Sequence, residues 1–135
     1  MPIKSRIESI DHIVLTYSNF KNTIDFYVNV LGMKVEEFYF SDQQNKRIAL
    51  RFGNQKINLH DSKKPHKPHA KIAITGTLDI CFLSSVKIKE WEKILNKNQI
   101  DIVDGPVERA GAEGKILSIY VRDPDYNLIE ISNKI

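Results

Sequence analysis

The chain is poor in the features that cross-link a protein, anchor it or keep it disordered. A single cysteine, Cys81, among 135 residues excludes an internal disulfide and favours a reducing cytoplasm. No apolar run approaches the ~20 residues that a membrane-spanning helix needs, and the N-terminal residues lack the apolar segment of a secretion signal. With 41% hydrophobic and 27% charged residues, the composition is that of a folded protein. We therefore expect a cytoplasmic globular domain with no membrane partner.

Positive charge is in slight excess, but it forms no extended basic stripe. The net charge is +3, and the one dense cluster spans residues 63–69, with three lysines, two histidines and two prolines. The prolines make this segment a loop, and no aromatic residues are interleaved with its basic side chains. We expect no nucleic-acid partner.

Hydrophobic periodicity predicts the order strand-helix-strand-strand-strand twice. The first helix begins at Ser18 or Asn19 as N-cap and ends at Gly32. The second helix covers Lys87–Lys97 and ends at Asn98. Helical spacing predicts burial of Phe20, Ile24, Tyr27, Leu31, Ile88, Trp91 and Leu95. The predicted strands are Asp11–Tyr17, Lys34–Phe40, Arg47–Phe52, Lys56–His60, Leu78–Leu83, Ile100–Val103, Ile116–Arg122 and Leu128–Ser132.

The repeat predicts one α+β domain made of two βαβββ modules. The first module spans residues 8–61, residues 62–76 form a linker rich in proline and lysine, and the second module spans residues 77–135. Open sheet edges favour a partner that covers them, so we expect a homodimer.

Four polar residues stand inside or at the ends of the apolar strands. His12 and Asp79 lie in the first strand of each module, and His60 and Glu130 lie in the last strand of each. The members of the two pairs are separated by similar distances along the chain, so the repeat suggests equivalent positions. Imidazoles and carboxylates meeting at one point would bind a divalent metal. Taken singly, each residue is also consistent with a strand end or a solvent-facing position.

Three longer motifs follow one another along the chain: Ile10–Leu15 (IDHIVL), Asp25–Met33 (DFYVNVLGM) and Tyr120–Glu130 (YVRDPDYNLIE). In this order they resemble the vicinal oxygen chelate superfamily of glyoxalases, bleomycin resistance proteins and extradiol dioxygenases. Gly53–His60 and Gly105–Ala112 are further similar to glyoxalase domain-containing protein 5 and its bacterial relatives. The resemblance implies two βαβββ modules whose sheets curl around a central cleft with a metal at its base.

The resemblance also implies a set of metal ligands. His12 and Glu130 match the first and last ligands of the family, Asp79 stands where many members have a second histidine, and His60 stands where glyoxalases have a glutamate. We expect His12, Asp79 and Glu130 in the first shell of Mn²⁺, Fe²⁺, Ni²⁺, Co²⁺ or Zn²⁺, with His60 as a fourth ligand or just outside. The exchanged ligand types argue against lactoylglutathione lyase activity itself.

Such a site predicts lyase or isomerase chemistry on a small substrate that chelates the metal through adjacent oxygens. Glu130 or Asp79 would act as base. Substrate-binding candidates are Arg51, Arg109, Tyr120 and Phe52, the arginines suiting an anion. Two other functions remain open: an oxygen-using metal enzyme, and a protein that sequesters a ligand without metal. We expect Cys81 to be a small core residue, and His66 and His69 to have no metal role.

Overall fold

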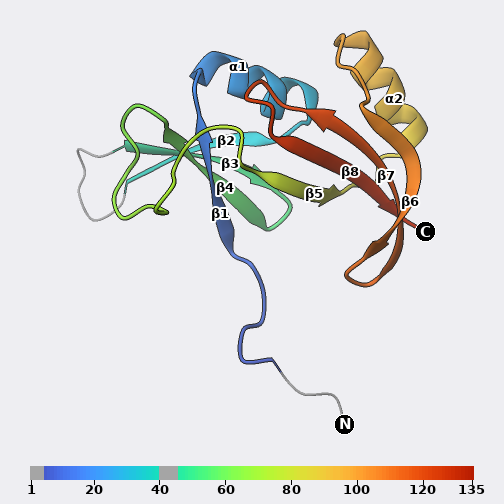
Figure 1. The fold of residues 1–135 in the computed structure, drawn as a ribbon, viewed down its shortest axis with the longest axis horizontal. Helices are drawn as coiled ribbons and strands as arrows, with labels where there is room; N and C mark the ends of the chain where they lie inside the picture. The colour runs from blue at the N-terminus through green and yellow to red at the C-terminus, as the bar shows by residue number, and fades with distance from the viewer. Residues whose placement is uncertain (1–4, 40–45) are drawn as a thin grey trace.

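The computed structural model describes residues 5–39 and 46–135, and its elements follow the predicted order (Figure 1). The expected α+β fold of two βαβββ modules is confirmed. Phe40, the end of the predicted strand Lys34–Phe40, lies outside the described residues. The elements are β1 (His12–Tyr17), α1 (Phe20–Ile24), η1 (Asp25–Val30), β2 (Lys34–Tyr39), β3 (Lys46–Phe52), β4 (Gln55–Asp61), β5 (Asp79–Leu83), α2 (Ile88–Lys97), β6 (Asp104–Gly111), β7 (Gly114–Arg122) and β8 (Leu128–Lys134).

Each module forms its own four-stranded sheet with the same topology. Sheet A has the order β1-β4-β3-β2, and sheet B has the order β5-β8-β7-β6. In both, the first strand pairs in parallel with the last, and the remaining pairs are antiparallel. Strands β1 and β5 are therefore edge strands, each next to the central strand that ends its module.

The helices cover one face of the sheets, and the two modules share one hydrophobic core there (Figure 1). This core includes Tyr27 from η1, Leu95 from α2, and Ile57 and Ile129 from the central strands. Phe52 and Phe82 meet edge to face across the module boundary, with ring centroids 5.2 Å apart. The opposite face of each sheet, which we call its open face, carries the polar positions of the strands.

The first helix differs in detail from its predicted burial pattern. Asn19 is its N-cap and accepts a hydrogen bond from the backbone N–H of Asn22, as predicted. Phe20, however, is 41% exposed, although its ring lies edge to face with that of Tyr17, so its predicted burial is wrong. The helix widens to a π-turn over η1, which turns adjacent Phe26 and Tyr27 into the core.

One strand was predicted in the wrong place. Residues 100–103 form no strand, and the sixth strand runs instead over Asp104–Gly111. This strand contains Pro106, whose missing N–H is tolerated because β6 is an edge strand. The register between β6 and β7 shifts between Asp104 and Val107, the segment that contains Pro106.

Candidate functional site

Glu130 lies at the centre of the open face of sheet B. In register, β8 places it between Cys81 of β5 and Tyr120 of β7. The Ser118 hydroxyl donates to Oε2 of Glu130 over 2.6 Å, and Ser118 Oγ lies 2.7 Å from Ser132 Oγ. Both serines are fully buried. This arrangement holds Oε2 of the Glu130 carboxylate in place.

Tyr120 and Arg109 stand beside this carboxylate. Arg109 Nε donates to Tyr120 Oη over 3.0 Å, and its guanidinium lies 3.4 Å from an Asp104 oxygen. Burial raises the pKa of Tyr120, and the nearby Glu130 carboxylate raises it further against the opposing effect of Arg109. These residues border a pocket of about 530 Å³, lined by Cys81, Leu83, Arg109, Ala110, Gly111, Ala112, Glu113, Gly114, Lys115, Ile116, Tyr120, Glu130, Lys134 and Ile135.

Asp79 and Cys81 share this open face. Cys81 is directly opposite Glu130 in the β5–β8 register, and Asp79 is two pairs earlier, opposite Leu128. Cys81 is exposed, so its expected role as a core residue is wrong. Burial and the carboxylates of Glu130 and Asp79 raise the pKa of its thiol, although the hydrogen bond with Ser132 lowers it. The thiol is thereby kept protonated, which argues against a nucleophile.

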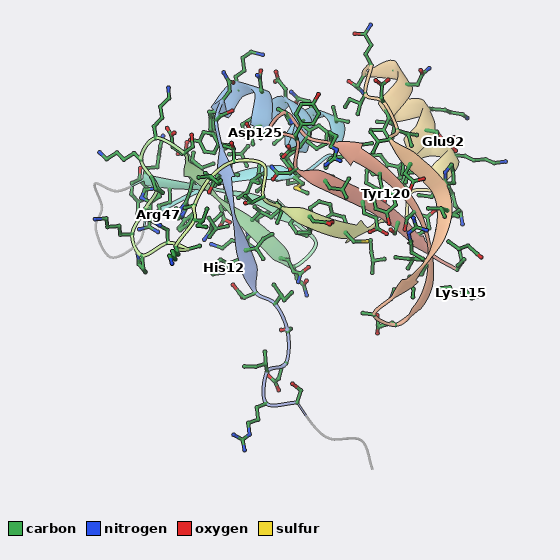
Figure 2. All side chains as sticks on the ribbon, viewed as in Figure 1. His12, Arg47, Glu92, Lys115, Tyr120 and Asp125 are labelled. Atoms are coloured by element: carbon green, nitrogen blue, oxygen red, sulfur yellow. The ribbon has the colours of Figure 1, made fainter. Side chains whose placement is uncertain are left out.

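His12 lies on the other sheet, at the start of β1 on the open face of sheet A. Its Nδ1 lies 2.9 Å from Asp11 Oδ2, and this hydrogen bond is the first cause of a lowered pKa of Asp11. A carboxylate bound to one ring nitrogen orients an imidazole and leaves Nε2 to bind a metal, an arrangement common in metal sites. Figure 2 shows His12 and Tyr120 on separate sheets.

The strand register corrects the predicted equivalence of His60 and Glu130. His12 pairs with Lys56 in sheet A, and Asp79 pairs with Leu128 in sheet B. Two residues farther along the last strand of each module stand Asn58 and Glu130, so Asn58 is the counterpart of Glu130. His60 corresponds to Ser132. Similar sequence separations suggested the wrong pair because the modules differ in the lengths of their loops.

His60 itself is buried, with 5% of its surface exposed, and its Nδ1 has no hydrogen-bond partner among the described residues. Its ring meets His66 edge to face at a centroid distance of 5.2 Å. Because the sequence places His66 in the linker, its contact with β4 was not foreseen. The spacing of histidines gave no signal for this contact.

Within residues 5–39 and 46–135, no three His, Cys, Asp or Glu side chains lie close enough to hold one metal ion. One chain therefore does not bring His12 together with Asp79 and Glu130. Of the predicted substrate-binding residues, Arg109 and Tyr120 border the pocket beside Glu130. Arg51 instead forms an ion pair with Glu36 on sheet A, its Nε 2.6 Å from Oε2, and Phe52 packs against Phe82 on the core side.

Comparison with known proteins identifies the family of this chain. The profile of the Glyoxalase/Bleomycin resistance protein/Dioxygenase superfamily matches residues 9–131. The chain belongs to this superfamily. The match spans both modules and contains all four predicted ligand positions. No helix of the described residues is long and apolar enough to cross a membrane.

Individual members of the superfamily are similar over most of the chain. Virulence protein STM3117 of Salmonella typhimurium is 48% identical over 96% of this chain and 87% of its own length. Its crystal structure superimposes with a TM-score of 0.89, covering 97% of this chain and all of that one. Glyoxalase domain-containing protein RDO1 of Mycosarcoma maydis is 47% identical over 94% of this chain and 69% of its own length. The Agrobacterium tumefaciens lactoylglutathione lyase, 19% identical, shares the fold with a TM-score of 0.69 over 96% of each chain.

Proposed function

We propose that the protein is a divalent-metal-dependent enzyme whose active site forms between two copies of the chain. The observation that carries this proposal is the matched placement of potential ligands on two open faces. His12 starts the first strand of sheet A, and Asp79 starts the first strand of sheet B, at equivalent positions in register. Sheet B adds Glu130. Since one chain keeps these faces apart, a second copy is needed to bring His12 to Asp79 and Glu130.

The donor set fits a borderline or hard divalent ion. One imidazole and two carboxylates suit Mn²⁺, Fe²⁺, Co²⁺, Ni²⁺ or Zn²⁺, and leave positions for a substrate. Asp11 orients the His12 ring, and Ser118 orients Glu130, as outer partners of metal ligands commonly do. Asn58, the sheet A counterpart of Glu130, is a neutral amide whose buried oxygen has no hydrogen-bond partner in the part of the chain that the structure describes. It adds no charge to the site.

We propose lyase or isomerase chemistry on a small substrate with adjacent oxygens. A bound divalent ion would supply Lewis-acid polarisation of those oxygens. Glu130 or Asp79 would accept a proton from the carbon beside the polarised carbonyl. Arg109 and Tyr120 would orient an anionic or oxygen-rich part of the substrate, because their N–H and O–H groups border the same pocket as Glu130. The buried serines fix the carboxylate during this transfer.

A weaker relative supports the metal dependence of this proposal. Metallothiol transferase FosB of Staphylococcus saprophyticus, 26% identical over 93% of this chain and 76% of its own length, is named for a metal-dependent transfer. An oxygen-using enzyme with two histidines and one carboxylate would need a histidine at the position of Asn58, but His60 lies two residues farther along β4. Ligand sequestration without metal is the outcome if the metal tests below fail.

Mixing two inactive variants tests the site between copies. His12→Ala and Glu130→Gln each remove one ligand and should abolish high-affinity metal binding. In a mixed dimer, one site carries both changes and the other carries neither. Statistical exchange should thus restore about a quarter of the sites of the parent protein. A site built within one chain would recover nothing on mixing.

The readout is metal content after dialysis, together with calorimetric titration of Mn²⁺ and Zn²⁺. Glu113→Gln is the matched control, because Glu113 borders the same pocket but forms an exposed ion pair with Lys134. Its metal binding should equal that of the parent. Metal occupancy should fall in acid, because protons compete with the metal for its ligands. Parent-like metal binding by Glu130→Gln would refute the proposal.

A further inference from the structure

Residues 5–11 precede β1, and we call this segment the N-terminal arm. Figure 1 shows it in blue, running from the start of β1 away from both sheets. It contains no helix or strand, and all of its residues are exposed. Among the described residues beyond the adjacent His12, only Gln55 forms a hydrogen bond to the arm, from its Nε2 to the carbonyl oxygen of Ile10 over 3.0 Å. The arm is thus attached to the domain at its base, and its outer part is exposed to solvent.

The arm carries two large apolar side chains and one unpaired carboxylate. Ile7 is 78% exposed, and Ile10 is 65% exposed. Glu8 stands between them and forms no ion pair with any other described residue. The isoleucines would gain free energy from removal from water. A surface that combines apolar side chains with a positive charge would therefore match the arm.

The pocket beside Glu130 offers such a surface. One end of this pocket is polar and contains Glu130 and Tyr120. The other end is lined by the apolar side chains of Leu83, Ile116 and Ile135. Ile116 and Tyr120 are four residues apart on β7, so the two ends are ~13 Å apart at 3.3 Å per residue. Lys115 stands at the apolar end and forms no ion pair within the part of the chain that the structure describes.

The position of His12 connects the arm to this pocket. His12 follows the arm directly, and one chain does not bring it together with Glu130. In the proposed active site, His12 of one copy meets Glu130 of the other, so the arm of the first copy starts at the polar end of the pocket of the second. Five extended residues span up to ~17 Å, which lets Ile7 reach the apolar end. The reach of the arm therefore matches the length of the pocket.

We propose that the N-terminal arm of each copy lies in the pocket beside Glu130 of a second copy. Ile7 packs at the apolar end, and Ile10 packs nearer to Glu130. The carboxylate of Glu8 pairs with Lys115, and the opposite charges fix the direction of the arm. This placement rests on the proposed function, because it follows from the meeting of His12 with Glu130. The arm covers the outer part of the active site against water, and the polar end stays open to the substrate.

Disulfide trapping between two different chains tests this placement. Both chains carry Cys81→Ser, which removes the native thiol. One chain adds Ile7→Cys in the arm, and the other adds Ile135→Cys at the apolar end of the pocket. The chains are mixed without metal, left to exchange and oxidised with diamide. Because a disulfide needs Cα atoms within about 7 Å, a linked heterodimer should form and approach half of the chains, the limit that statistical exchange sets. Intact mass spectrometry identifies the linked pair.

The matched control replaces Ile7→Cys by Lys93→Cys. Lys93 is exposed on α2, which covers the other face of the sheets, so it should give less than a tenth of the linked heterodimer. Sedimentation supplies a second measurement. Ile7→Asp should raise the dissociation constant of the dimer at least tenfold, because it places a charge in the apolar end of the pocket. Val103→Asp changes an exposed valine that does not line the pocket, and it should dimerise like the parent.

Heterodimer trapping no greater than that of the Lys93→Cys control would overturn the placement of the arm. Dimerisation of Ile7→Asp at the parent level would overturn it as well. Metal sites restored by mixing the His12→Ala and Glu130→Gln proteins, without trapping of the arm, would refute the arm and sustain the proposed function. Trapping in a protein that binds no metal would sustain the arm and refute the proposed enzyme.

Discussion

Tyr27 of η1 donates a hydrogen bond to Asp123, in the turn before β8, with 2.7 Å between Oη and Oδ2. Both residues are buried. Asp123 also accepts the backbone N–H groups of Asp125 and Asn127 and the side-chain amide of Asn127. Burial, reinforced by the Asp123 carboxylate, raises the pKa of Tyr27 far above its usual range. This hydrogen bond links the first module to the turn before β8, the strand that carries Glu130.

Replacing Tyr27 by Phe should destabilise the protein without unfolding it. The ring keeps its packing in the core, but the Asp123 carboxylate loses its tyrosine donor while three other donors remain. The expected loss is about 1–3 kcal/mol in the free energy of unfolding, measured by urea denaturation. Tyr126→Phe, at a tyrosine that is 75% exposed, is the control and should change little. Equal stability of the two variants would contradict the role of this bond.

Local sequence patterns predicted most helices, strands and turns of the fold. The helix caps at Asn19 and Asn98 and the turn at residues 53–54 were predicted correctly, because each depends on a few neighbouring residues. The wrong strand at Ile100–Val103 and the exposed Phe20 depend on tertiary structure: an edge position tolerates Pro106, and a π-turn changes which residues face the core.

Less of the candidate site than of the fold could be predicted from the sequence. The apolar strands, the repeat and the family motifs predicted Glu130, Asp79 and His12 as site residues. Ser118 as the donor to Glu130 follows only from the pairing of β7 with β8. The choice between Asn58 and His60 depends on strand register, which sequence separation does not determine when loop lengths differ. For the same reason, sequence could not show that His66 meets His60.

Removing the hydroxyl of Ser118 should weaken metal binding at Glu130. Ser118→Ala deletes the 2.6 Å hydrogen bond that holds Oε2, so the carboxylate gains freedom. Outer partners of metal ligands typically contribute about 10–100-fold in affinity, and we expect a loss in this range by calorimetric titration of Zn²⁺. Ser85→Ala, at an exposed serine, is the control. An unchanged affinity in Ser118→Ala would argue that Glu130 needs no such support.

Acid should destabilise the protein through His60 and His66. Burial lowers the pKa of both imidazoles in the folded chain, with added repulsion from positive neighbours including Arg47. The unfolded chain then binds more protons, so their contribution to stability is present above the ordinary value of 6.5 and is lost as pH falls below it. Urea denaturation between pH 8 and 5 should show the free energy of unfolding declining. The His60→Gln, His66→Gln double variant should show a shallower decline, and an equal slope would contradict this origin.

A negative charge introduced on β5, the edge strand of sheet B next to β8, should dissociate the proposed dimer into monomers. Leu83 of β5 is 56% exposed, and Val14 of the other edge strand, β1, is 45% exposed. Open edges with apolar side chains are usually covered by a partner. Leu83→Glu would place an unpaired carboxylate in that contact, so sedimentation at tens of micromolar should shift from dimer to monomer. Metal binding should be lost with it, since His12 would no longer reach Glu130.

Val103→Glu is the matched control for this experiment, because Val103 is 51% exposed but precedes β6, at the far side of sheet B from β5. Its sedimentation and metal content should equal those of the parent. A parent protein that sediments as a monomer, or a Leu83→Glu dimer with full metal content, would place the contact elsewhere. A Leu83→Glu monomer that keeps its metal would instead separate dimerisation from metal binding, because the ligands would then have to come from one chain.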